Sequence, residues 1–241
     1  MNNITPVVKN LLIINVIFFI AKLLFSHLHP DYYLGAFYFN SSLFQVWQPI
    51  TYMFMHADYM HIFFNMFALY SFGSILEAHW GGKRFLNFYL ITGLGALALQ
   101  WGVQAFEVYQ LTGSVFNPDA VTVDFATEMV NLNLKGLSAA DAKTIMSIYS
   151  TPMVGASGAI FGLLVAFGML YPNLEMYIMF IPVPIKAKYI IPIYVVIEFS
   201  LGVARIEGDS IAHFAHLGGA LIGFILVKLW RNKNNYYDYY D

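Results

Sequence analysis

The 241-residue chain contains no cysteine and few charged residues, and both deficits restrict what it can be. Without cysteine it can form no disulfide, no thiolate metal site and no cysteine nucleophile. Charged residues make up 11% of the chain and hydrophobic residues 59%, so charge is too scarce to cover a water-facing surface. The net charge of −2 offers no basic surface for nucleic acid. The composition therefore predicts a membrane protein.

Long apolar runs predict a polytopic all-α bundle in which residues 1–233 form one membrane domain. We predict six spans, at about 7–25, 57–78, 85–106, 157–171, 189–204 and 211–230. The first run ends in Ser26-His27 rather than in a small-residue cleavage site, so we expect it to remain as a span. An external insertion at 107–152 should hold short helices, one of them capped by Ser138. We expect residues 234–241 to be a disordered tail.

The basic residues predict the orientation in the membrane. One side of the six-span arrangement carries Lys9, Lys83, Arg84, Lys186, Lys188, Lys228, Arg231 and Lys233. The opposite side carries only Lys22, Lys135, Lys143 and Arg205. Because basic loops remain on the cytoplasmic side, we expect both termini in the cytoplasm, with a bacterial inner membrane as the location. The aromatic 26–56 loop, expected to lie in the membrane interface, then faces the outside together with the insertion.

Ser157 begins the fourth span, which is short. Roughly 16 residues at ~1.5 Å each reach ~24 Å, against a hydrocarbon core of ~30 Å. The start of this span is therefore expected to be sunk in a cavity open to the outer side, because non-helical backbone at that depth must be enclosed by protein or water. Gly155 allows the backbone to turn sharply there. Free N–H groups at the helix start suit a developing negative charge, so Ser157 is predicted to be a nucleophile.

Small residues predict which helix lies against the serine. The fourth and sixth spans each have a small-residue face, formed by Gly158, Gly162, Gly219 and Gly223. Such faces let two helices approach closely, and His216 shares its face with the last two glycines. We therefore expect His216 beside Ser157. Phe161, one turn after the serine, has two possible roles, namely support of the imidazole ring by stacking or an ordinary place in the core.

Polar residues in the second span predict donors for an oxyanion. His61 and Asn65 are one helical turn apart on the same face. Together with the N–H group of Ser157 they are suitable donors for the oxyanion formed in acyl transfer. The alternative is that both side chains only join helices by hydrogen bonds.

The remaining buried polar residues are expected to have structural roles. We expect His56 to structure its loop and Glu77 to bond neighbouring loop backbone. His213 and His216 form a possible metal pair, but no H-E-x-x-H motif is present, so we expect no metal and no cofactor. Glu198 is the other acid within a span. A proton-relay role was considered for it, but a single carboxylate without an obvious partner makes a poor transport pathway.

These motifs, taken in order, resemble the rhomboid family of intramembrane serine proteases, of the bacterial type with six spans. They are His56-x4-His61-x3-Asn65, Gly73-x3-Glu77, Trp80-Gly81-Gly82-Lys83-Arg84-Phe85, Gly155-x-Ser157-Gly158, Ile181-Pro182-Val183-Pro184-Ile185-Lys186-Ala187-Lys188 and His216-x2-Gly219-x3-Gly223. The resemblance covers nearly the whole chain. It implies a Ser157–His216 dyad, oxyanion support from His61 and Asn65, and cleavage of transmembrane segments of other proteins. Two positions depart from the family pattern: Gln48 follows Trp47 where arginine is frequent, and Phe161 replaces a frequent tyrosine.

The expected chemistry is acyl transfer without an acid, in which His216 removes the proton of Ser157. Substrates would be membrane proteins that come sideways from the lipid, past the fifth span and the 205–212 turn, where Gly202 and Gly208 are weak points. One alternative is a non-catalytic rhomboid-like protein that binds transmembrane segments. Another is a small transporter, which would need broken helices in two related halves, and only one such feature is present.

Overall fold

The computed structural model describes residues 4–124, 129–177, 183–204 and 212–231. Within them, the helices long and apolar enough to cross a membrane are α1 (Pro6–Leu24), α4 and α5 (Tyr59–Ala68 and Ser74–Trp80, joined by a π-type turn over Leu69–Gly73), α6 (Gly82–Thr112), α9 (Ala187–Ala204) and α10 (His213–Arg231). A shorter apolar helix, α8 (Ser157–Leu170), accompanies them. The protein is thus an all-α polytopic membrane bundle. The expected tail at 234–241 and the turn with Gly208 lie outside the described residues.

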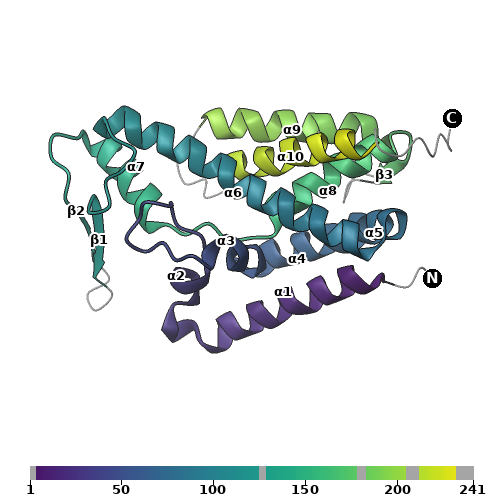
Figure 1. Ribbon diagram of the computed structural model, residues 1–241, viewed down its shortest axis with the longest axis horizontal. Coiled ribbons are helices and arrows are strands. Elements are labelled where there is room, and N and C mark those ends of the chain that lie inside the picture. The colour runs from purple at the N-terminus through teal and green to yellow at the C-terminus, as the bar shows by residue number, and fades with distance from the viewer. Residues whose placement is uncertain (1–3, 125–128, 178–182, 205–211, 232–241) are drawn as a thin grey trace.

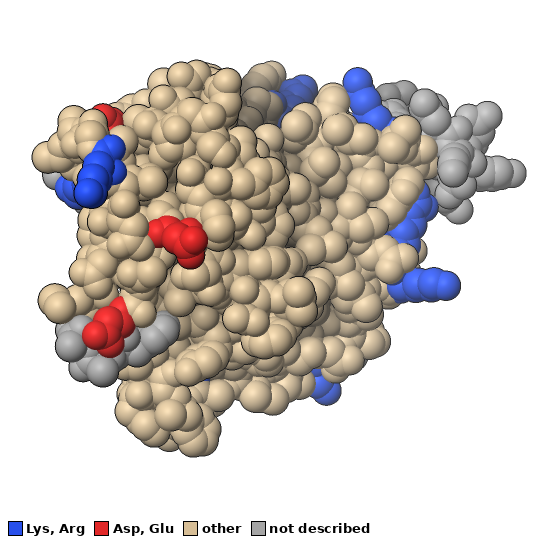
Figure 2. All heavy atoms as spheres, turned by 60° about the vertical axis from the view of Figure 1, so that its left-hand side comes forward, with Lys and Arg blue, Asp and Glu red and all other residues tan. Residues whose placement is uncertain are grey.

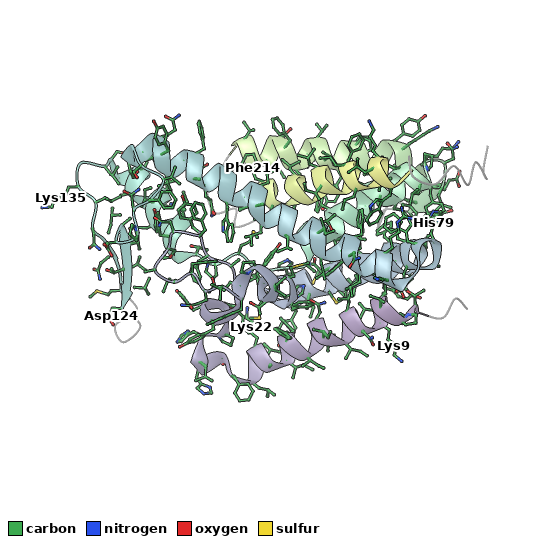
Figure 3. All side chains as sticks on the ribbon, viewed as in Figure 1. Lys9, Lys22, His79, Asp124, Lys135 and Phe214 are labelled. Carbon is green, nitrogen blue, oxygen red and sulfur yellow. The ribbon has the colours of Figure 1, made fainter. Side chains whose placement is uncertain are left out.

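The helices run side by side along the long axis of the molecule (Figure 1). Helix α10 packs against α6, α8 and α9. Helix α1 begins and α10 ends at the same end of the bundle, whereas α7 (Ala139–Ser150), β1 (Val121–Asp124) and β2 (Met129–Leu132) lie at the opposite end. Figure 3 places Lys9 and His79 near the first end and Asp124 and Lys135 near the second. The described ends of the chain therefore lie on one side, as six spans require.

The surface between the two ends carries almost no charge (Figure 2). On the face shown, acidic side chains lie towards the end that holds the insertion, and most basic side chains lie towards the other end. Exposed apolar side chains cover the helices between them, including Ile17 of α1, Phe63 of α4 and Val196 of α9. A belt of this kind is the surface that lipid requires.

Helix α8 is enclosed by the other helices and is shorter than all the helices of spanning length. It has 14 residues, and all residues from Gly158 to Leu163 are buried. A helix that is apolar on every side is stable only when it is surrounded. At ~1.5 Å per residue it extends ~21 Å and is therefore shorter than the ~30 Å hydrocarbon core. By contrast, α6 has 31 residues and continues to Thr112, beyond the predicted end at 106.

Glycine backbones bring α8 and α10 into contact, although the geometry differs in one respect from the prediction. A Cβ atom on Gly219 would overlap the carbonyl oxygen of Gly158, and one on Gly223 would lie 2.8 Å from the Cα of Gly162. The missing side chains of Gly158 and Gly162, however, point to α6, at Ala96 and Thr92 respectively. The glycines of α8 thus allow α6 to approach closely, while the glycines of α10 allow α8 to approach closely.

The 26–56 loop, which we predict to lie in the membrane interface, packs partly against the rest of the protein. It contains two short helices, α2 (Pro30–Leu34) and α3 (Gln48–Thr51), and 3₁₀ turns at Ser26–Leu28 and Tyr52–Phe54. Tyr33 is exposed, but Phe37 and Tyr38 are buried, and the Tyr38 ring centroid lies 5.2 Å from that of Tyr149 in the insertion. Ala36 forms a β-bridge with Met153. The loop therefore supports the chain segment that leads to Ser157.

Gln48 holds this loop together from within. Its side chain is fully buried, its Oε1 accepts hydrogen bonds from the N–H groups of Phe37 and Gln45, and its Nε2 donates to the carbonyls of Tyr32 and Leu43. A neutral amide can satisfy both donors and acceptors. At the position where the family often has arginine, this chain therefore has a residue that bonds four backbone groups.

The 107–152 insertion contains a β-hairpin that we did not predict. Strands β1 and β2 pair antiparallel, and α7 is the helix expected after Ser138, whose hydroxyl accepts the N–H of Asp141 at 3.2 Å. Short strands of mixed polarity resemble loop sequence, so periodicity did not indicate them. A second hairpin, β3 (Glu175–Tyr177) with β4 (Pro184–Lys186), connects α8 to α9. Of the sequence motif at 181–188, residues 181–182 lie outside the described residues.

Glu77 has a more specific structural role than the one predicted. Its two carboxylate oxygens accept the N–H groups of Val7 and Val8, at 2.9 and 2.8 Å. These N–H groups belong to the first turn of α1, which lacks partners within its own helix. Glu77 therefore caps α1 and joins it to α5, whereas the prediction assigned it to loop backbone.

Candidate active site

Ser157 is the first residue of α8, and the backbone before it has a conformation that suits glycine. Gly155 has φ +131°, and a Cβ atom there would lie 2.8 Å from both Cε1 and Nε2 of His61 and 3.5 Å from Oγ of Ser157. Its N–H donates to the carbonyl of Tyr52 at 2.9 Å, which fixes the turn. Among the described residues, no side chain caps the start of α8. The first N–H groups of this helix are therefore not taken up by a capping side chain.

The structure brings His216 to Ser157. The Nε2 atom of His216 lies 2.8 Å from Oγ of Ser157, a hydrogen-bond distance. The imidazole stacks on Phe161, with ring centroids 4.3 Å apart and an interplanar angle of 9°. The sequence predicted the pair, and stacking was one of the two roles it allowed for Phe161. The hydroxyl that a tyrosine at 161 would add is not needed for this contact.

Among the described residues Glu198 has two partners, neither of which was obvious from the sequence. Its Oε2 atom lies 2.8 Å from Nδ1 of His216 and 2.7 Å from Nδ1 of His213. The residue comes from the middle of α9 and is only 4% exposed. An acid therefore contacts the histidine that contacts the serine, whereas the sequence predicted a site without an acid.

The cluster of Glu198, His213 and His216 is a possible ligand set, because the donor atoms all lie within 4.8 Å of one another. The prediction against a metal considered only the two histidines and missed the third donor. The N···O distances of 2.7 and 2.8 Å are nevertheless hydrogen-bond lengths. They are shorter than the roughly 3.3 Å that separates two ligand atoms around a tetrahedral zinc ion. The geometry is that of a hydrogen-bonded cluster.

His61 has its proton on Nε2. The N–H of Ala57 donates to Nδ1 at 3.3 Å, so in the neutral imidazole Nε2 is the donor. That nitrogen lies beside Gly155 and therefore close to Ser157. Asp58 caps the helix by accepting the N–H of His61 at 2.9 Å, and this bond lowers the pKa of Asp58. The cap thus fixes the backbone from which the His61 ring extends.

Asn65 lies one turn further along α4 and is buried. Its Nδ2 donates to the carbonyl of His61 at 2.7 Å, and Oδ1 has no partner among the described residues. An amide nitrogen carries two donor hydrogens, so one remains after this bond.

His56 acts through its backbone more than through its ring. Its carbonyl accepts Nζ of Lys22 at 2.8 Å, and Lys22 also pairs with Asp31 at 2.8 Å. The ring nitrogens have no hydrogen-bond partner among the described residues, and the ring packs edge-on against His61 at 5.1 Å. Burial, followed by the neighbouring His61, lowers the pKa of His56 to about 3. The ring is therefore neutral near pH 7.

The order of these motifs, together with the contact between Ser157 of α8 and His216 of α10, can be compared with known proteins. The sequence model of the rhomboid domain matches residues 43–116 and 120–233. The chain belongs to the rhomboid family. It is 31% identical over 178 residues to RHOMBOID-like protein 12, mitochondrial, of Arabidopsis thaliana, covering 73% of this chain and 44% of that protein.

Two bacterial rhomboid relatives are named proteases. The chain is 29% identical over 178 residues to Rhomboid protease GluP of Bacillus subtilis, covering 74% of this chain and 25% of that protein. It is 28% identical over 207 residues to Rhomboid protease AarA of Providencia stuartii, covering 80% of this chain and 59% of that protein. The chain thus spans from a quarter to about three-fifths of the length of these three rhomboid relatives.

Proposed function

We propose that this protein is an intramembrane serine endopeptidase that cleaves peptide bonds in or near transmembrane segments of other membrane proteins. The observation that carries the proposal is the 2.8 Å distance between Oγ of Ser157 and Nε2 of His216, at the start of a short enclosed helix. Membership in the rhomboid family and the protease names of two relatives support it. No observation favours the alternative of a non-catalytic protein that only binds transmembrane segments.

In the proposed reaction, Nε2 of His216 takes the proton of Ser157 while Oγ attacks the carbonyl carbon of the scissile bond. The oxyanion is held by the N–H of Ser157, by Nε2–H of His61 and by the second donor hydrogen of Asn65. His216 then gives its proton to the leaving amine, and an acyl-enzyme remains. Water hydrolyses the ester by the same route and returns the proton to Ser157.

The proposed substrates are transmembrane helices that unwind near the outer end. A helical backbone satisfies its own hydrogen bonds, so a peptide carbonyl reaches Ser157 only after local unwinding. Glycine and other weak helix formers near the cleaved bond lower that cost by about 1 kcal/mol each. We also propose that the passage from lipid lies beside α9, where Gly202 contacts the start of α10; residues 205–211 of that turn lie outside the described residues.

The proposed orientation has both ends of the chain in the cytoplasm and the catalytic site open to the outer side. This orientation is supported by the excess of lysine and arginine at the end of the bundle that holds the start of α1 and the end of α10. One of the three relatives is named a mitochondrial protein and the other two are bacterial proteins. The relatives therefore do not favour a bacterial inner membrane over an organelle membrane.

A serine-directed fluorophosphonate tests the proposal directly. We expect the detergent-solubilised protein to be labelled and to cleave a model transmembrane substrate. Both signals should fall by more than about 1000-fold in Ser157→Ala and in His216→Ala, since the two residues act as a unit. Ser200→Ala is the matched control, because Ser200 is an exposed serine of α9 that donates only to the carbonyl of Val196 in its own helix. If the wild-type protein is neither labelled nor active, the alternative function, non-catalytic binding of transmembrane segments, would replace the proposed one.

A further inference from the structure

One buried carboxylate oxygen receives two imidazole groups. Oε2 of Glu198 lies 2.7 Å from Nδ1 of His213 and 2.8 Å from Nδ1 of His216, and the side chains of the acid and the two histidines are 6%, 6% and 12% exposed. The acid belongs to α9, while both histidines lie in the first turn of α10. An ionised carboxylate in such a place is stable only if donors compensate for its lost hydration.

This arrangement determines where the protons of His216 are. An ionised carboxylate can only accept hydrogen bonds, so Nδ1 of His216 must be the donor. In a neutral imidazole the other nitrogen then carries the lone pair. That nitrogen, Nε2, is the atom 2.8 Å from Oγ of Ser157. Glu198 therefore holds His216 in the one tautomer that can accept the proton of Ser157.

We propose that Glu198 is the positioning residue of the catalytic base, so that Ser157, His216 and Glu198 act together as a three-residue relay. This inference rests on the proposed protease function. When Nε2 takes the proton of Ser157, the imidazole becomes a cation in contact with the carboxylate, which stabilises it. The proton stays on Nε2 until it passes to the leaving amine, Nδ1 keeps its own proton, and Glu198 stays ionised.

Two contacts define the position of the His216 ring, one at its face and one at its edge. Phe161 lies flat against its face at 4.3 Å and sets the plane of the ring. Within that plane the ring can still rotate or exchange its nitrogens, and the Glu198 contact at its edge prevents both. His213 supplies the second donor to the same oxygen, which helps to keep the carboxylate ionised and in place.

The test compares Glu198→Gln with wild type in one detergent, measuring kcat, KM and the pH dependence of kcat/KM on a model transmembrane substrate. The amide has the same shape, but it has no charge and can present N–H to Nδ1, which favours the wrong tautomer. We expect kcat to fall at least about 100-fold, KM to change less than about threefold, and fluorophosphonate labelling to slow in proportion to kcat. Among the described residues, the titratable groups that act on Glu198 and His216 are His213 of α10, Tyr194 of α9 and His61 of α4, and all three are unchanged in this variant.

The pH profile separates positioning from packing. Loss of the negative charge disfavours the cationic form of His216, so the acid limb of kcat/KM should move to lower pH by about one unit or more. Glu198→Asp keeps the charge and should restore the acid limb and part of kcat. His213→Ala should reduce kcat less than Glu198→Gln does, because the bond between Glu198 and His216 remains.

Glu77→Gln is the matched control, since Glu77 is also a buried acid but caps α1. It should lower the melting temperature and leave the pH profile of activity as it is.

A wild-type kcat and a wild-type pH profile in Glu198→Gln would overturn the proposal. The proposal would also be overturned if Glu198→Gln lost activity only as far as it lost folding, kept the acid limb of kcat/KM at the wild-type pH, and was not rescued by Glu198→Asp. A wild-type enzyme that a chelator inactivates and zinc restores would identify a metal site instead. If the wild type neither cleaves nor takes the label, the proposed function itself fails.

Discussion

Two buried asparagines form the same local hydrogen bond, and only one of them lies in the proposed site. Asn15 of α1 donates Nδ2 to the carbonyl of Leu11 at 2.7 Å, and Asn65 of α4 donates Nδ2 to the carbonyl of His61 at 2.7 Å. Both bonds run back one helical turn, a pattern that competes little with the helix itself. Asn65 can thus be compared with a residue that makes the same local hydrogen bond on α1 rather than on α4, the helix that carries His61.

Replacing these asparagines separates an oxyanion donor from a packing residue. Asn65→Ala should lower kcat by roughly 10–1000-fold with a smaller change in KM, because a donor directed at the oxyanion acts mainly in the transition state. Asn15→Ala should keep kcat while losing a similar ~1 kcal/mol of stability from its hydrogen bond. Steady-state kinetics and thermal unfolding of both variants are the measurements. Equal kcat values in the two variants would reduce Asn65 to a structural role.

At the scale of elements, the site depends on how closely α8 and α10 approach. Ser157 is on one helix and His216 on the other, so the spacing of the helices sets the distance between Oγ and Nε2. Gly219 permits that spacing, because any side chain there would overlap the Gly158 carbonyl. Gly168 further along α8 is different, since the atom nearest to a Cβ atom there would be the side-chain Cδ1 of Ile191, at 2.8 Å, rather than a backbone atom.

We therefore expect Gly219→Val to be nearly inactive yet folded, and Gly168→Val to keep much of its activity. A shift of about 1 Å can cost ~10²-fold in rate, whereas overpacking a core costs ~1–3 kcal/mol of stability. Substrate cleavage and melting temperature should be measured for both variants in the same detergent. Full activity in Gly219→Val would mean that the helices can separate without moving the base from the serine.

At the scale of the whole molecule, the two ends of the bundle differ in charge and in structure. One end carries the start of α1, the end of α10 and most of the basic side chains on the face shown in Figure 2, whereas the other carries α7 and the β1–β2 hairpin. A membrane that retains basic segments on the cytoplasmic side would orient this bundle in one direction.

The natural lack of cysteine makes this orientation simple to measure. Lys135→Cys, at the end with the insertion, should react with a membrane-impermeant maleimide on intact cells. Lys83→Cys, in the first turn of α6, should react only after the membrane is permeabilised. Both lysines are exposed, so accessibility depends on the side of the membrane and not on burial. The reverse pattern of labelling would mean that the proposed site opens to the cytoplasm.

The spans and the central pair of the candidate site were predictable from the sequence for physical reasons. Membrane helices need long apolar runs, and the predicted spans correspond to α1, α4–α5, α6, α8, α9 and α10, with boundaries shifted by a few residues, and by six at the end of α6. Ser157 and His216 could be paired because glycines mark faces where helices approach closely. These are local signals, which periodicity and spacing can express.

Only the tertiary structure decided which distant groups meet. Glu198 is 18 residues from His216, and its contact depends on the rotation of α9 against α10, about which an apolar sequence says little. Gln48 holds the 26–56 loop through bonds to four backbone groups, and such bonds leave no periodic pattern. The sequence by itself determined the membrane bundle, the small-residue faces of its helices and the serine–histidine pair, because hydrophobic length and small-residue spacing are properties of single helices. The contact between Glu198 and His216 was decided by the packing of the helices, because a buried carboxylate is stable only where donors surround it.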